Sequence, residues 1–236
     1  MRGRQTVDAQ AANGQYLARK DIFEIPIPNS TDRLPIAQRR TLDWRPQAIA
    51  FDCYDTLLTI TNRRGPYQQL AALAGGRLDP SPMTLPMSLR DVVERNMPRI
   101  ELRAGILEKL EADLLNELAS VQPLPGAIEA LQHLRDLGYR LAVASNLALP
   151  YSEPLKNWLG SLVDVQILSF EVGSAKPSAL FYEETCKRLA VEPSEVLMVG
   201  NSLKNDVVAA EAAGLQARHL RLGERLQQTL RDLLQG

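Results

Sequence analysis

The sequence predicts an α/β fold whose core is a doubly wound parallel sheet, with a small α-helical cap domain attached to it. Short apolar runs of strand length alternate with amphipathic helical patterns through the second half of the chain. This alternation is typical of a parallel sheet covered by helices on both faces. One earlier apolar run is separated from the series by a helical insertion, and polar residues follow several of the runs directly.

The first core strand is expected at residues 47–51, where a nearly continuous apolar run ends at Asp52. A short continuous run of this kind is typical of a strand buried on both faces of a parallel sheet. Later runs with the same character predict further strands at residues 139–144, 163–168, 195–199 and 216–222.

Helical patterns separate these strands. Residues 126–137 place Ile128, Leu131 and Leu134 on one face of a helix, and Gly138 stands where a helix of that length would end. Further helices are expected at residues 178–189, at residues 206–213 and over the C-terminal residues. Each connects one predicted strand to the next, as a parallel sheet requires.

The segment between the first strand and the rest of the core is predicted to be a helical cap. Residues 66–73 and 88–118 have helical patterns, and Pro98 is expected to divide the second of them into two helices. We therefore assign residues 61–123 to the cap and residues 46–60 and 124–236 to the core. Residues 1–45 are polar and without sustained periodicity. They are expected to form an N-terminal extension that packs on the domain or on a partner, or is partly disordered.

Composition excludes several classes of function. The formal net charge of −1 does not indicate the basic surface that binds nucleic acid. The two cysteines form no metal or redox motif, which fits a reducing compartment. No segment approaches the roughly 20 apolar residues of a membrane span, and the first residues lack the apolar region of a secretory signal. A cytoplasmic protein acting on a small molecule is expected, with no nucleic-acid or membrane partner and with its oligomeric state open.

Polar side chains follow four of the predicted strands or the loops after them. Because ligands bind at the carboxyl ends of the strands in open α/β sheets, these side chains are the candidate site. His133 and His219 fall away from the strand ends and are expected to be non-catalytic. The candidate residues, in chain order, are Asp52, Tyr54, Asp55, Thr56, Ser145, Asn146, Lys176, Asn201, Ser202 and Asp206.

Four segments resemble the motifs of the haloacid dehalogenase superfamily of hydrolases in order and spacing. They are Phe51-Asp52-Cys53-Tyr54-Asp55-Thr56-Leu57, Ala144-Ser145-Asn146, Ala175-Lys176-Pro177, and Val199-Gly200-Asn201-Ser202-Leu203-Lys204-Asn205-Asp206. The resemblance covers about residues 46–222. It implies a Rossmann-like core with a mobile cap, and a reaction through an aspartyl-enzyme intermediate.

The resemblance and the residue types together suggest roles. A carboxylate can attack phosphorus or carbon and form a covalent intermediate, so Asp52 is the expected nucleophile. Ser145 and Lys176 would hold the transferred group, with Lys176 supplying positive charge for its oxygens. Asn146 and Thr56 could add hydrogen bonds to the substrate. Arg63 and Arg64, at the entrance to the cap, could bind an anionic substrate.

Magnesium is the expected cofactor. Asp206 would anchor Mg²⁺ in a phosphatase, or would orient Lys176 if no metal is bound. The other candidate metal ligands are Asp52, Tyr54 and Asn201.

Two positions depart from the pattern of the family's phosphatases. Tyr54 stands where those enzymes usually carry an aspartate that acts as general acid and base, a role that typically contributes about 10²–10⁴-fold to the rate. Asp55 is not expected to replace it, because adjacent strand-end residues tend to point in opposite directions. Asn201 stands where the phosphatases usually have a second aspartate, so Mg²⁺ could be bound more weakly or be absent.

Three functions follow, in order of preference. The first is a hydrolase that uses Asp52 on a small organic substrate, preferably a phosphate monoester. The second is a carbon–halogen hydrolase similar to the 2-haloacid dehalogenases, which carry a tyrosine at the position of Tyr54 and use no metal. The third is a degenerate member of the family that binds a ligand or a protein without catalysis.

Overall fold

The computed structural model describes residues 44–96 and 103–235, and residues 45–236 form one compact unit. Residues 1–43 of the predicted N-terminal extension, and Pro98, lie outside the described residues. Within those residues, no helix has both the length and the apolar character needed to cross a membrane.

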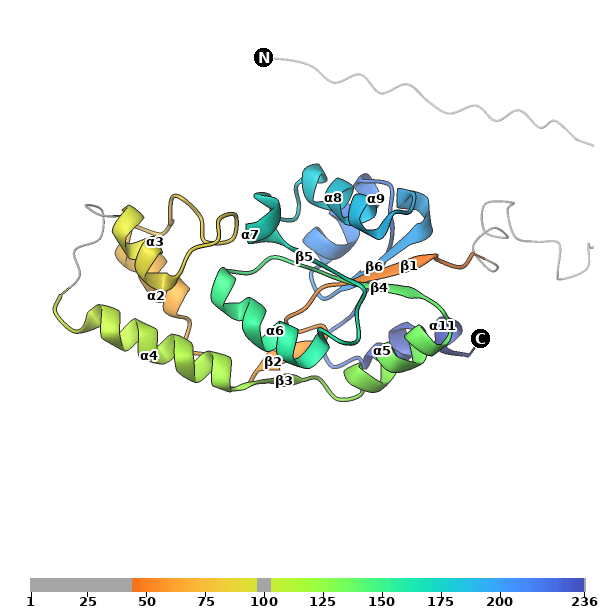
Figure 1. Cartoon of the computed structure of the whole chain (residues 1–236), viewed down its shortest axis with the longest axis horizontal. Helices are drawn as coiled ribbons and strands as arrows, with labels where there is room; N and C mark the ends of the chain where they lie inside the picture. The colour runs from red at the N-terminus through yellow and green to blue at the C-terminus, as the bar shows by residue number, and fades with distance from the viewer. Residues whose placement is uncertain (1–43, 97–102, 236) are drawn as a thin grey trace, which may run out of the picture. The chain divides into compact units, whose positions relative to one another are not determined.

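The core is a sheet of parallel strands with the order β5-β4-β1-β6-β7, and the expected α/β architecture is confirmed (Figure 1). Strand β1 is central and pairs with β4 on one side and β6 on the other, with Phe51 opposite both Val143 and Val199. The register therefore aligns the carboxyl ends of the three strands. The strands are β1 (Ala48–Phe51), β4 (Arg140–Ser145), β5 (Val165–Leu168), β6 (Val196–Gly200) and β7 (Gln216–His219).

Helices cover both faces of this sheet. All four residues of β1 have no exposed surface, because their side chains alternate between two buried faces. Ala48 and Ala50 pack in the cluster that contains Phe181 and Tyr182. Figure 1 shows α8 and α9 on this side of the sheet and α5 and α11 on the other. The helices of the core are α5 (Ala127–Asp136), α6 (Ser152–Leu159), α7 (Ser169–Val172), α8 (Ala179–Leu189), α9 (Ala209–Ala212), α10 (Leu226–Thr229) and α11 (Arg231–Leu234), with short helical turns η1 (Leu149–Tyr151), η2 (Pro193–Glu195) and η3 (Leu203–Val208).

Most predicted boundaries agree with the structure to within one residue, and three were wrong by two or more. Strand β5 begins at Val165 rather than at residue 163, and β7 ends at His219 rather than at residue 222. The helix expected at 206–213 begins at Leu203 as the π-helical turn η3 and continues as α9. Its cap explains the earlier start, because the Ser202 hydroxyl accepts the backbone N–H of Asn205.

The insertion after β1 is helical, as expected. It contains α2 (Pro66–Leu73), α3 (Leu89–Asn96) and α4 (Ile106–Ala119), which share a buried apolar cluster that includes Leu70, Val92 and Leu110. The chain enters through β2 (Leu58–Ile60) and returns through β3 (Val121–Pro123), and these two strands pair antiparallel. The sequence patterns did not predict this two-stranded stem. The division into a separate core and cap stays a prediction.

Candidate functional site

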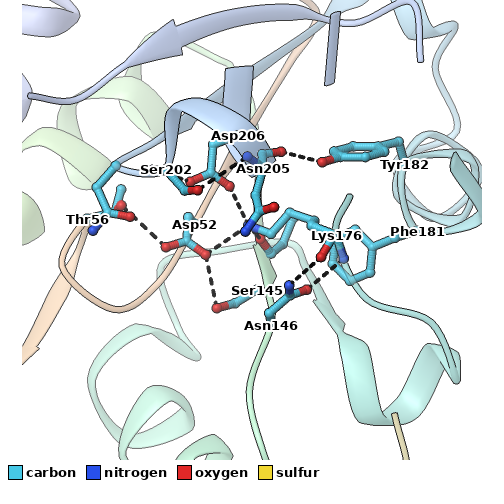
Figure 2. Close-up of polar contacts among 12 residues, drawn as sticks. Asp52, Thr56, Ser145, Asn146, Lys176, Phe181, Tyr182, Ser202, Asn205 and Asp206 are labelled. Atoms are coloured by element: carbon cyan, nitrogen blue, oxygen red, sulfur yellow. Dashed lines mark hydrogen bonds and ion pairs between the residues drawn. The ribbon is translucent and has the colours of Figure 1, made fainter. Parts of the chain in front are cut away.

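Side chains from four segments meet beside the carboxyl end of β1 (Figure 2). Asp52 follows β1 directly, Ser145 ends β4, Lys176 comes from the loop before α8, and Asp206 lies on η3 after β6. Ser145, Lys176 and Asp206 are buried. The sheet register brings together residues that are up to 154 positions apart.

Asp52 has one engaged and one open carboxylate oxygen. Its Oδ1 accepts hydrogen bonds from Ser145 Oγ at 3.1 Å and from Lys176 Nζ at 2.8 Å. Among the described residues, its Oδ2 has one polar contact, with Thr56 Oγ1 at 3.5 Å, which is at the outer limit for a hydrogen bond. The Asp52 backbone N–H donates to Val199 O, which continues the pairing with β6. The carboxylate is therefore held in place while Oδ2 stays available to a ligand.

Lys176 is the cation of the site. Its Nζ donates to Asp52 Oδ1 at 2.8 Å, Asp206 Oδ1 at 2.6 Å and Ala144 O at 2.8 Å, so that each ammonium proton has an acceptor. Burial alone would lower the pKa of Lys176, but the charges of Asp52 and Asp206 and the hydrogen bonds to them raise it above its ordinary value. Lys176 is therefore a permanent positive charge rather than a proton donor.

Both oxygens of Asp206 already have partners. Oδ1 accepts from Lys176, and Oδ2 accepts the Ser202 backbone N–H at 2.9 Å. Burial raises the pKa of Asp206; Lys176 opposes this rise and the charge of Asp52 adds to it. A Cβ atom at Gly200 would lie 2.3 Å from Asp206 Oδ2, so the carboxylate can reach this position only beside a glycine.

The amide group of Asn146 is bound to the main chain of the loop that carries Lys176. Its amide nitrogen donates to Lys176 O and its oxygen accepts from Lys176 N, both at 2.8 Å. These bonds fix the loop that carries Lys176. The hydrogen bond from Asn146 to a substrate stays a prediction.

The two residues that follow Cys53 point to different partners. The Tyr54 hydroxyl donates to Tyr151 O at 2.8 Å, and burial raises the pKa of Tyr54 far above its ordinary value. Asp55 has a φ of 63° and its carboxylate accepts from Nη2 of Arg63 at 2.6 and 2.7 Å. Among the described residues, neither side chain forms a hydrogen bond with Asp52. That Asp55 does not replace the missing aspartate stays a prediction.

Asn201 is exposed, and its backbone oxygen lies 3.0 Å from His219 Nε2. His219 is therefore closer to a strand-end motif than expected. Within residues 44–96 and 103–235, no group of three or more His, Cys, Asp or Glu side chains could hold a metal ion. A metal at this site would depend on few carboxylates, which suits Mg²⁺ because this ion often keeps water and substrate oxygens among its ligands.

A pocket of about 210 Å³ lies between the helical insertion and the core. Tyr54 and Asn146 connect it to the candidate site, and Arg63 lines it, whereas Arg64 does not. A larger pocket of about 550 Å³ lies on the other side of the stem, beside Asp55, Thr56, Asn201 and the loop after β7. The smaller pocket has walls from both the insertion and the core, which is the usual position of a binding cleft between two parts of a fold.

Two residues that line the smaller pocket, Glu117 and Tyr151, were not predicted from the sequence. Glu117 is a buried carboxylate near the end of α4 that accepts the backbone N–H groups of Arg64 and, at 2.6 Å, of Gly65. It also accepts the Tyr151 hydroxyl at 2.5 Å. Glu117 thus ties the insertion to η1 of the core. The only sequence signal was a glutamate in the otherwise apolar stripe of α4.

Comparisons with known proteins agree with this geometry. A family model described as a haloacid dehalogenase-like hydrolase matches residues 46–214. A protein of Methanopyrus kandleri named glyceraldehyde 3-phosphate phosphatase is 30% identical over 202 residues, which cover 75% of this chain and 85% of that protein. A second protein with this name, from Methanothermobacter thermautotrophicus, is 31% identical over 43% of this chain and 46% of its own length.

Solved structures share the fold. The structure of a HAD phosphatase from Thermococcus onnurineus has a TM-score of 0.52 at 26% identity and covers 75% of this chain and 88% of its own. A HAD family enzyme from Bacteroides thetaiotaomicron, in complex with magnesium and inorganic phosphate, has a TM-score of 0.60 at 12% identity, over 77% of this chain and 97% of its own. The names of the sequence relatives favour a phosphatase over a dehalogenase. With a family model matched over most of its length, this chain belongs to the haloacid dehalogenase-like hydrolases.

Proposed function

We propose that the chain is a phosphatase that hydrolyses small phosphate monoesters through a phosphorylated Asp52. The observation that carries this proposal is the asymmetry of the Asp52 carboxylate. Ser145 and Lys176 bind Oδ1, while Oδ2 has, within the part of the chain that the structure describes, only the 3.5 Å polar contact with Thr56. A nucleophile held by one oxygen and open at the other can attack without first losing a strong hydrogen bond.

The reaction has two steps. Asp52 Oδ2 forms a bond to phosphorus as the bond from phosphorus to the ester oxygen breaks; the ester oxygen leaves with the electron pair of that bond and takes a proton from solvent water to become the alcohol. Water then attacks phosphorus and gives up a proton to solvent, the bond to Asp52 breaks, and inorganic phosphate is released with the carboxylate restored. Lys176 and Ser145 fix the carboxylate in both steps, and Lys176 also offsets part of the negative charge on the transferred group.

The charges of the site favour a cation. Asp52, Asp206 and Lys176 together carry a formal charge of −1, and a phosphate monoester adds further negative charge. Mg²⁺ would neutralise phosphate charge when bound, and the residues proposed to hold it are Asp52, Tyr54, Asn201 and Asp206. Because both oxygens of Asp206 already have partners, we propose that Asp206 acts mainly by orienting Lys176.

Phosphate release by the purified chain tests the proposal. A panel of phosphate monoesters is assayed with Mg²⁺ and with a chelator, beside the Asp52→Asn variant. Phosphate release that depends on Mg²⁺ and is lost in Asp52→Asn is expected. Asn keeps the size of the side chain, so a melting temperature near that of the wild type shows that the loss is chemical. Release that persists in Asp52→Asn contradicts the proposed nucleophile.

Carbon–halogen hydrolysis is the second candidate, favoured by Tyr54 and Asn201. A halide leaves without a proton, so the absence of a general acid would not slow this reaction. Halide release from 2-haloacids that is indifferent to chelator would support it against the phosphatase. No turnover with either panel, together with ligand binding that Asp52→Asn leaves unchanged, would favour a binding protein.

A further inference from the structure

We propose that Arg63, held by Asp55, recognises a second anionic group on the substrate. The substrate class is then a small phosphate monoester whose organic part carries a carboxylate or a second phosphate. This inference rests on the proposed phosphatase function and extends it to specificity.

The first observation is the backbone of Asp55. Its φ of 63° lies in the left-handed region, which glycine adopts without steric cost and in which a side chain is disfavoured. Aspartate is one of the few residues with a side chain that adopt this conformation in turns. Here the turn places the carboxylate so that both of its oxygens contact Nη2 of Arg63.

The second observation is how Arg63 is used. A single nitrogen, Nη2, makes both contacts with Asp55. Among the described residues, Nε and Nη1 have no partner, so the guanidinium keeps donors that suit a carboxylate or phosphate. The Arg63 side chain is 53% exposed, and an exposed ion pair adds little to folding stability. The pair with Asp55 therefore serves mainly to orient the Arg63 side chain.

Arg63 is also one of the residues that line the pocket between the insertion and the core, together with Tyr54, Tyr67 and Tyr151. The charge of Arg63 is close enough to act on Tyr54. The acidic group in this pocket, Glu117, already accepts hydrogen bonds at both oxygens. Among the described residues that line this pocket, Arg63 is the one cation, so a ligand that reaches from Asp52 into the pocket meets positive charge.

The pocket has room for the organic part of a small phosphate ester. Its volume is about 210 Å³, which suits a short carbon chain with an anionic end. Three tyrosines form its aromatic wall, and Gln68, Glu117 and Asn146 are its polar side chains besides Arg63.

Three esters with a two-carbon organic part test the inference: phosphoglycolate, ethylene glycol bisphosphate and ethyl phosphate. The wild type is expected to prefer one or both of the first two over ethyl phosphate, measured as kcat/KM. Arg63→Met should reduce this preference by about 10- to 100-fold, the usual range for a charge-assisted hydrogen bond. Arg63→Lys should fall between, because lysine keeps the charge and loses the planar fork.

Asp55→Gly separates recognition from folding. Glycine suits the backbone, so the melting temperature should stay within about 4 °C of the wild type. Release of Arg63 should still reduce the preference, by about 2- to 10-fold, because an unfixed side chain must be ordered by the ligand. Arg77→Met is the matched control, because Arg77 is an exposed arginine of the insertion that does not line the pocket; it should leave the preference unchanged.

The outcomes distinguish the two proposals. Equal kcat/KM for all three esters, or a preference that survives Arg63→Met, overturns the role of Arg63 and leaves the phosphatase intact. If no ester releases phosphate, the phosphatase proposal fails. Recognition is then tested without catalysis, by calorimetric titration of phosphoglycolate and ethyl phosphate into Asp52→Asn and into the double variant with Arg63→Met. Equal affinity of Asp52→Asn for the two esters refutes the role of Arg63.

Discussion

Replacing Lys176 by methionine tests the buried charge cluster most directly. Methionine keeps much of the length of the side chain and removes the ammonium group, which leaves Asp52 and Asp206 facing each other without a cation. Three hydrogen bonds are lost, at 2.8, 2.6 and 2.8 Å. The side chain of Asp206 is only 1% exposed, so water cannot replace them.

The expected cost is large. Removing one partner of a buried ion pair typically costs about 3–5 kcal/mol of unfolding free energy, because the other charge is left buried and unpaired. For a unit of this size each kcal/mol lowers the melting temperature by about 2–4 °C, so a decrease of roughly 6–20 °C is expected. Urea unfolding followed by circular dichroism measures the free energy.

The loss should depend on pH in a defined direction. The folded pKa of Asp206 is raised, and Lys176 opposes this rise; without the lysine the folded pKa moves further above the unfolded value of about 3.9. A carboxyl group with a raised folded pKa binds protons more readily in the folded state, so folding becomes more favourable as the pH falls through that pKa. The deficit of Lys176→Met should therefore be smaller at pH 5 than at pH 7.

A double variant supplies the control. Adding Asp206→Asn removes one of the unpaired charges and should recover about 1–2 kcal/mol of the loss. A cost below 1 kcal/mol for Lys176→Met, or no recovery in the double variant, would refute the claim that the lysine neutralises these two carboxylates.

Three further outcomes are expected. Tyr54→Asp should raise kcat about 10- to 100-fold for alkyl phosphates, because their leaving groups need a proton that an aspartic acid can supply. Tyr54→Phe should not raise kcat, and steady-state kinetics of the two variants measure the difference. Asn201→Asp should tighten Mg²⁺ binding about tenfold in titration calorimetry, and no gain would argue against a place for Asn201 at the metal. Gly200→Ala should destabilise the fold by about 1–3 kcal/mol in urea unfolding, because its methyl group would overlap the Asp206 carboxylate.

Much of the core could be predicted from the sequence because its signals are local. The apolar run before Asp52 is short and continuous, which identifies a buried strand without knowledge of its neighbours. Once parallel strands are assumed, their carboxyl ends share one edge, and Ser145 and Lys176 come together with Asp52. The ends of elements were less predictable, as at Leu203, where one hydroxyl cap moves the helix start.

The cap side of the site was not predictable in the same way. The stem pairs Leu58–Ile60 with Val121–Pro123, and strands of three residues are too short to show a period. Glu117 and Tyr151 contact each other across 34 positions and have no motif around them. Such contacts depend on how the insertion packs on the core, and packing of this kind leaves no periodic pattern in the chain.

Tyr54 and Asp55 are best understood as one change rather than two. At Tyr54 the hydroxyl is bound to Tyr151 O, so this position contributes to the wall of the pocket and has no proton to give to a leaving group. The neighbouring carboxylate points the other way, because Asp55 adopts a left-handed backbone, and it binds Arg63. We infer that the turn after the nucleophile serves recognition in place of proton transfer. An enzyme built in this way gains selectivity from the anionic end of its substrate and depends on the leaving group, or on a bound metal, for its rate.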